Sequence, residues 1–130
     1  MIGRRGERAI RALALLTLSL AACGLPTGDT FVYEADAPEL ANASVVEGKW
    51  QSAPPFGADW LPYPPRATLE VAHGLGRTPV NLDVWLSFEE SGAEPAKAAG
   101  DLARWIDADD ATVTVRNETS AMFFARIIVE

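Results

Sequence analysis

The feature that most constrains the fold of this 130-residue chain is the strict alternation of apolar and polar side chains in short segments. The clearest case is VNLDVWLSF, residues 80–88, where Val80, Leu82, Val84, Leu86 and Phe88 share one face and Asn81, Asp83, Trp85 and Ser87 share the other. A period of two residues predicts a half-buried β-strand, because an amphipathic helix repeats its apolar residues every three to four positions.

Shorter segments of the same kind recur along the chain and are separated by turn residues. We expect strands within RATLEVAH (66–73), LARWIDA (102–108), TVTVRN (112–117) and AMFFARIIVE (121–130), and a further short strand within SVVEGKWQSA (44–53). Regularly spaced short strands predict an all-β fold. The expected architecture is a small antiparallel β-sandwich of about six strands.

The segment 54–65, PPFGADWLPYPP, contains five prolines and is predicted to be a loop or an edge segment. A proline donates no hydrogen bond to a sheet and is therefore excluded from central strands. Its aromatic residues Phe56, Trp60 and Tyr63 form either a lid on the core or an exposed binding surface. The lid is the expectation, because exposed apolar clusters are uncommon on soluble domains.

Residues 1–22 have the three zones of a secretory signal peptide. Four arginines stand near the start, an apolar run follows from Ala12, and the small residues Ala21 and Ala22 precede the single cysteine, Cys23. The apolar run of 11 residues is too short for a transmembrane helix, which needs about 20. We therefore expect a leader that directs the chain out of the cytoplasm.

The sequence Leu20-Ala21-Ala22-Cys23 resembles the lipobox of bacterial lipoproteins. The resemblance implies that the Cys23 thiol receives a diacylglyceryl group, that signal peptidase II cleaves before it, and that acyl chains such as palmitate anchor the protein. An ordinary signal peptide that leaves a free cysteine is the alternative. In Gram-negative lipoproteins, an aspartate after the cysteine commonly retains the protein in the inner membrane. This chain has Gly24 there, so the resemblance implies delivery to the outer membrane if the host is Gram-negative.

These observations predict three parts of the chain: a lipoprotein signal peptide (1–22), a lipidated cysteine with a tether (23–44), and a β-sandwich domain (45–130). Without the leader the chain has 7 basic and 17 acidic residues, a net charge of about −10. This charge argues against a nucleic-acid partner, because phosphate binding needs clustered Lys and Arg. Since acidic groups also repel anionic lipid headgroups, we expect the anchor to hold the protein on the membrane.

A second resemblance covers residues 48–130. The segments HGLGRTPVNLDVWLSF and WIDADDATVTVRNETSAMFFARIIVE are similar to C-terminal β-sandwich modules of phage tail fibres and of bacterial lipoproteins. Gly48-Lys49-Trp50 is similar to a strand of the H-type lectin domain. The lectin family's last strand contains a tryptophan, whereas this chain ends ARIIVE, so no sugar-site residue is carried over.

Trp85, Asp83 and Asn81 are the candidate ligand-binding residues, because they share the polar face of one predicted strand. An aromatic ring can stack on the C–H face of a sugar while neighbouring Asp and Asn side chains bind its hydroxyl groups. The alternative is that Trp85 packs beneath the proline-rich segment. Nothing in the sequence calls for a cofactor.

Asp107, Asp109 and Asp110 form a candidate Ca²⁺ site, because Ca²⁺ takes six to eight oxygen ligands. A solvated acidic turn is the plainer interpretation. His73 is the only histidine of the chain. It is expected to cap the HGLG turn through a ring nitrogen, and its alternative role is that of a general base.

The sequence thus predicts a lipid-anchored cell-envelope protein, not an enzyme, with a binding or structural role toward a glycan or an envelope protein. Two alternatives remain open. One is an envelope hydrolase that uses His73 and the acidic residues 107–110, and the other is a homo-oligomer built through the apolar segment Met122–Val129.

Overall fold

The computed structural model describes residues 28–130, so Cys23 and the predicted lipobox lie outside the described residues. The first sheet has the strand order β1 (Thr30–Tyr33), β5 (Thr68–Ala72), β9 (Thr112–Arg116), β8 (Arg104–Ala108). The second sheet has the order β2 (Ser44–Val46), β3 (Lys49–Gln51), β10 (Phe123–Val129), β6 (Leu82–Ser87), β7 (Ala96–Lys97), with β4 (Leu61–Tyr63) also paired to β10. Two single-turn 3₁₀ helices are η1 (Pro38–Leu40) and η2 (Gly100–Leu102).

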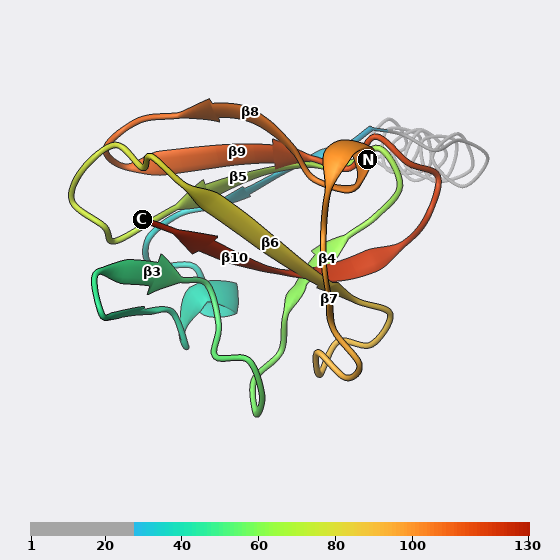
Figure 1. Ribbon diagram of the computed structural model, residues 1–130, viewed down its shortest axis with the longest axis horizontal. Coiled ribbons are helices and arrows are strands. Elements are labelled where there is room, and N and C mark those ends of the chain that lie inside the picture. Colours follow the sequence, from blue (N-terminus) through green and yellow to red (C-terminus); the bar gives the residue numbers. More distant parts are fainter. Residues whose placement is uncertain (1–27) are drawn as a thin grey trace, which may run out of the picture.

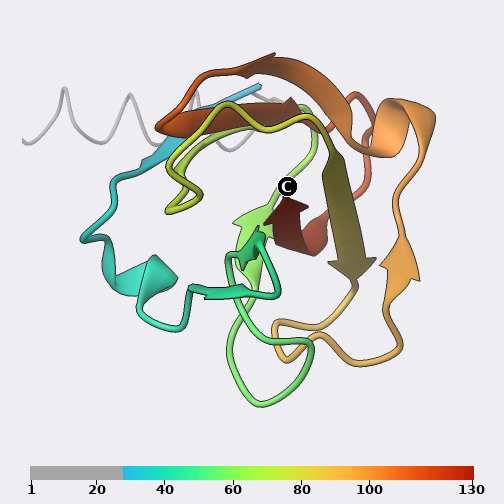
Figure 2. The same ribbon diagram turned by 60° about the vertical axis from the view of Figure 1, so that its left-hand side comes forward.

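The two sheets lie face to face as a sandwich (Figure 1, Figure 2), which confirms the predicted all-β class. Residues 28–130 form ten strands and not six, because several of them have only two to four residues, too few to show an alternating pattern. Over residues 28–130, no helix is long and apolar enough to span a membrane.

The core lies between the sheets and consists of alternate residues from the predicted strands. Leu69 and Val71 of β5 are completely buried, and so are Ile127 and Val129 of β10. Burying one such side chain stabilises a fold by about 1.5–3 kcal/mol, so these strands supply much of the driving force for folding.

Strand β6 is shorter than the alternation suggested. Val84 and Leu86 are buried, but Val80 and Phe88 are 76% and 78% exposed. The prediction that all five apolar residues of 80–88 face the core was therefore wrong at both ends. The pattern continues beyond the point where the strand leaves the sheet at Ser87, so local periodicity overestimated its length.

The folded part begins before the predicted boundary at residue 45. Residues 30–33 form β1, which pairs in parallel with β5, and Tyr33 and Leu40 belong to the core. The predicted tether of residues 23–44 was therefore too long. A parallel pair leaves no local signal, because its two strands are far apart in the sequence.

Residues 44–53, expected as one strand, form the hairpin of β2 and β3. Glu47 and Gly48 both have positive φ, 52° and 79°, between the paired residues Val46 and Lys49. A two-residue turn of this kind matches the twist of the flanking strands.

The proline-rich segment is a loop that ends in β4, a strand with a single partner, as predicted. Trp60 and Tyr63 are buried with 2% and 0% exposure, whereas Phe56 is 69% exposed. The segment thus covers the core with Trp60 and Tyr63, as expected for a lid, whereas Phe56 lies on the surface.

Strand β10 lies in the middle of the six-stranded sheet. It pairs with β6 on one side and with β3 and β4 on the other. A homo-oligomer could therefore not extend this sheet along β10 and would have to use other surfaces.

Candidate functional site

The candidate site lies on the outer face of the six-stranded sheet, around Trp85. Strand β6 turns Val84 and Leu86 toward the core and therefore turns Trp85 outward. Arg126 of β10 is its partner on one side and Lys97 of β7 on the other. Side chains directly opposite on neighbouring strands are about 5 Å apart at Cβ, so Trp85 leaves the sheet between the side chains of Arg126 and Lys97.

A groove of about 210 Å³ opens beside this indole. We call it the Trp85 groove. Its lining residues are Pro55, Phe56, Trp60, Trp85, Pro95 and Arg126. They come from the proline-rich loop, from the loop between β6 and β7, and from two adjacent strands. The groove is therefore mostly apolar and aromatic, with one guanidinium group in its wall.

Arg126 fixes the proline-rich loop against the sheet. Its Nε donates to the carbonyl oxygen of Ala53 at 2.7 Å, and its Nη2 donates to Oε1 of Gln51 at 2.6 Å. Desolvation lowers the pKa of Arg126 from its ordinary value. Because two hydrogen bonds hold the guanidinium, this wall of the groove is set in the folded chain before any ligand arrives.

Trp60, which lines the groove, is held by contacts with Pro54 and Gly92. The Trp60 Nε1 donates to the carbonyl oxygen of Pro54 at 3.3 Å, and a Cβ on Gly92 would lie 2.4 Å from the Trp60 ring. The glycine thus lets the loop after β6 pack directly on the indole.

Of the three predicted ligand-binding residues, only Trp85 lines the groove. Asp83 forms an ion pair with Lys97, with Oδ1 and Nζ 2.9 Å apart. The Nδ2 of Asn81 donates to Oε1 of Glu130 at 3.1 Å, at the end of the sheet. A binding role for the three residues together stays a prediction.

Sequence reasoning missed Pro95 and Arg126 as part of this site. Arg126 did carry a signal, since it is a charged residue within an otherwise apolar strand. Phe56 and Trp60 were singled out as aromatic, but which strand they would meet depends on the packing of a loop, which no periodicity reveals.

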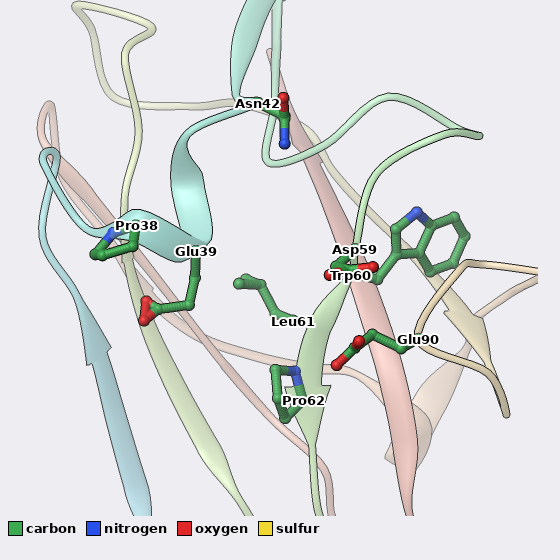
Figure 3. A pocket seen from close by; sticks show the side chains of 8 residues that line it. All are labelled: Pro38, Glu39, Asn42, Asp59, Trp60, Leu61, Pro62 and Glu90. Atoms are coloured by element: carbon green, nitrogen blue, oxygen red, sulfur yellow. The ribbon is translucent and has the colours of Figure 1, made fainter.

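A second hollow, of about 330 Å³, has acidic walls. Figure 3 shows Glu39 on one side of it, Asp59 and Glu90 on the other, and Leu61 between them. The Trp60 ring points away from this pocket, so the same residue separates the two hollows.

His73 caps its turn, as predicted. Its Nδ1 accepts a hydrogen bond from the Leu75 backbone N–H at 3.3 Å, and its Nε2 is 2.9 Å from the carbonyl oxygen of Asp109, to which it donates in that tautomer. The ring is 7% exposed and packs edge-on against Trp50. Both ring nitrogens are therefore engaged by the backbone.

Two carboxylates of the acidic turn at residues 107–110 accept hydrogen bonds from nearby backbone N–H groups. Oδ1 of Asp109 accepts hydrogen bonds from the N–H groups of Ala111 and Thr112, which lower the pKa of Asp109. Oδ1 of Asp107 accepts from the Ala108 N–H at 2.9 Å. Within residues 28–130, no group of three or more His, Cys, Asp and Glu side chains could hold a metal ion, so the structure does not bring Asp107, Asp109 and Asp110 together in the way the predicted Ca²⁺ site requires.

Comparisons of the chain with protein-family models, with curated proteins and with solved structures gave no match.

Proposed function

We propose that this chain is a lipid-anchored protein of the cell envelope that binds a glycan, without catalysis, in the Trp85 groove. The observation that carries the proposal is the outward-facing Trp85 in a preformed aromatic groove, between Arg126 and Lys97. Pyranose rings present apolar C–H faces that stack on indole rings, while the cations can donate hydrogen bonds to hydroxyl or carboxylate oxygens.

The leader supports the envelope location. The lipobox at Leu20–Cys23 follows a signal-like segment, and two or three acyl chains hold a protein stably in a bilayer. If the host is Gram-negative, Gly24 favours the outer membrane.

Binding is tested on a glycan array with the full chain, with Trp85→Ala, and with Trp105→Ala as the matched control. Trp105 is also part-exposed, at 40%, but lies on the other sheet. We expect Trp85→Ala to lose the glycan signal and Trp105→Ala to retain it. Equal binding by both variants would overturn the assignment of the groove. If no glycan binds, and a protein is captured from solubilised envelope by the wild-type chain but not by Trp85→Ala, the ligand of the groove is a protein partner instead.

The anchor is tested by labelling cells with palmitate. The wild-type chain should be labelled, and Cys23→Ser should not, because Cys23 is the single cysteine of the chain. An unlabelled wild-type chain that retains its leader would refute the lipoprotein assignment.

A further inference from the structure

We propose that the end of the sandwich bearing Arg66, Arg104 and Arg116 rests on an anionic lipid surface, with this end facing the bilayer. The inference rests on the proposed lipid anchor at Cys23 and adds an orientation and a lipid preference to it. We call this end of the molecule the arginine end.

The three arginines come together where the described chain begins. Arg104 of β8 and Arg116 of β9 are direct partners in an antiparallel pair. A Cβ on Gly28 would lie 3.4 Å from the Arg66 carbonyl oxygen and 3.8 Å from Nη2 of Arg116. In Figure 1, the N-terminal ends of β1 and β8 and the C-terminal end of β9 lie at the opposite end of the molecule from the C-terminus of the chain.

The anchor lies close to this end along the chain. Only six residues separate Cys23 from Thr30, the first residue of β1. A fully extended chain spans at most about 3.6 Å per residue, so the lipidated residue would be within about 25 Å of β1. Strand β10 alone, with seven residues, is about as long, so the anchor keeps the start of β1 within about one strand length of the bilayer surface.

Charge is distributed unevenly along the molecule. At the arginine end the three arginines balance Asp29, Asp101 and Glu118, whereas the rest of residues 28–130 holds four basic and fourteen acidic residues. The summed charge of the rest of the domain is therefore repelled by an anionic surface, whereas this end is not, and the resulting torque favours one orientation.

The side chains at this end also favour an external anion. Like charges directly opposite on paired strands destabilise a sheet, and only Arg116 of the pair has an acidic partner among the described residues, with Nε 2.7 Å from Oε1 of Glu118. Arg66 and Arg104 are exposed, and Nη1 of Arg66 donates to the carbonyl oxygen of Glu118, which leaves its other N–H groups for an external anion. Trp105, which is 40% exposed, follows Arg104 in the sequence, and aromatic residues favour the bilayer interface.

The test uses the full lipidated chain reconstituted in vesicles of phosphatidylcholine, with or without phosphatidylglycerol, and with a dansyl group on a trace of headgroups. Energy transfer from Trp105 to dansyl reports how close the arginine end is to the lipid, and Trp105→Phe gives the background from the other three tryptophans. We expect higher transfer on the anionic vesicles, and we expect high salt to abolish the difference.

The triple variant Arg66→Gln, Arg104→Gln, Arg116→Gln should lose the difference between the two vesicle types. The matched control Lys49→Gln, Arg77→Gln, Lys97→Gln removes the same charge from exposed sites elsewhere and should keep it. Equal transfer on both vesicle types by the wild-type chain, or loss of the difference in both variants, would overturn the orientation and leave the anchor intact. A chain that carries no lipid and fails to reconstitute would instead refute the proposed function.

Discussion

At the scale of single residues, the completely buried side chain of Asn117 links several separate backbone segments by hydrogen bonds. Its amide nitrogen donates to the carbonyl oxygens of Tyr63, Pro64 and Ala121, at 2.9–3.3 Å. Its Oδ1 accepts from the N–H and the hydroxyl of Thr119. One amide thus joins the exit of β4 to the turn between β9 and β10.

We predict that Asn117→Ala lowers the free energy of unfolding by about 3 kcal/mol, because it leaves several buried backbone groups without partners. Chemical denaturation measures the change. The control Asn42→Ala alters an exposed asparagine and should cost less than about 0.5 kcal/mol. A loss at Asn117 no larger than that of the control would show that the network contributes nothing to stability.

Asp109 gives a prediction on pH dependence. Hydrogen bonds from the N–H groups of Ala111 and Thr112 lower its pKa in the folded chain below 3.8. A lowered pKa means that the carboxylate stabilises the fold fully above its unfolded pKa and stops doing so as the pH falls through the folded pKa. The stability difference between wild type and Asp109→Ala should therefore be largest near neutral pH and shrink in strong acid.

Denaturation curves collected at several pH values measure this difference. Asp110→Ala is the control, because it removes the neighbouring acid of the same exposed turn without touching the two N–H groups. A difference for Asp109→Ala that does not change with pH would exclude a carboxylate role in the turn.

At the scale of elements, what could be predicted from the sequence follows the length of each strand. Strands β5, β6, β9 and β10 have five to seven residues, enough for alternation to identify them and the residues they bury. Strand β1 could not be placed in a sheet, because its partner β5 lies beyond several intervening elements. Of the site, Trp85 was identified by its place on the polar face of β6, but the groove depends on how two loops pack over that strand, and packing between loops has no periodicity.

The contact between Gly92 and Trp60 gives a prediction for these loops. Gly92→Ala adds a Cβ 2.4 Å from the indole, at a position whose φ is +78°. The ring must move, so we expect about 2 kcal/mol less stability and weaker glycan binding in the Trp85 groove.

The matched control is Gly76→Ala, because Gly76 has φ +80° and nothing within 4 Å of the added Cβ. It therefore reproduces the backbone strain without the collision. Thermal denaturation of both variants separates the two effects, and equal losses would mean that the Trp60 contact plays no part.

At the scale of the whole molecule, the dominant feature is the excess of acidic groups. Residues 28–130 contain 7 basic and 17 acidic residues, and three exposed or part-exposed ion pairs offset only part of the repulsion: Lys49–Glu130, Lys97–Asp83 and Arg116–Glu118. Surface ion pairs each contribute about 0–1 kcal/mol. The anionic groups are spread over both sheets and their loops, so their mutual repulsion acts across the molecule and not at one point.

Repulsion over such distances is screened by salt, since the Debye length falls from about 30 Å at 0.01 M to about 3 Å at 1 M. We therefore predict that sodium chloride raises the melting temperature, although it also weakens the three ion pairs. A variant with Glu34→Gln, Asp36→Asn and Glu39→Gln removes three exposed acids near β1 and η1 and should melt higher at low salt, with a smaller response to added salt. Stability that falls as salt is added would mean that local ion pairs outweigh the net charge, and the orienting effect of that charge at a lipid surface would then have to be small as well.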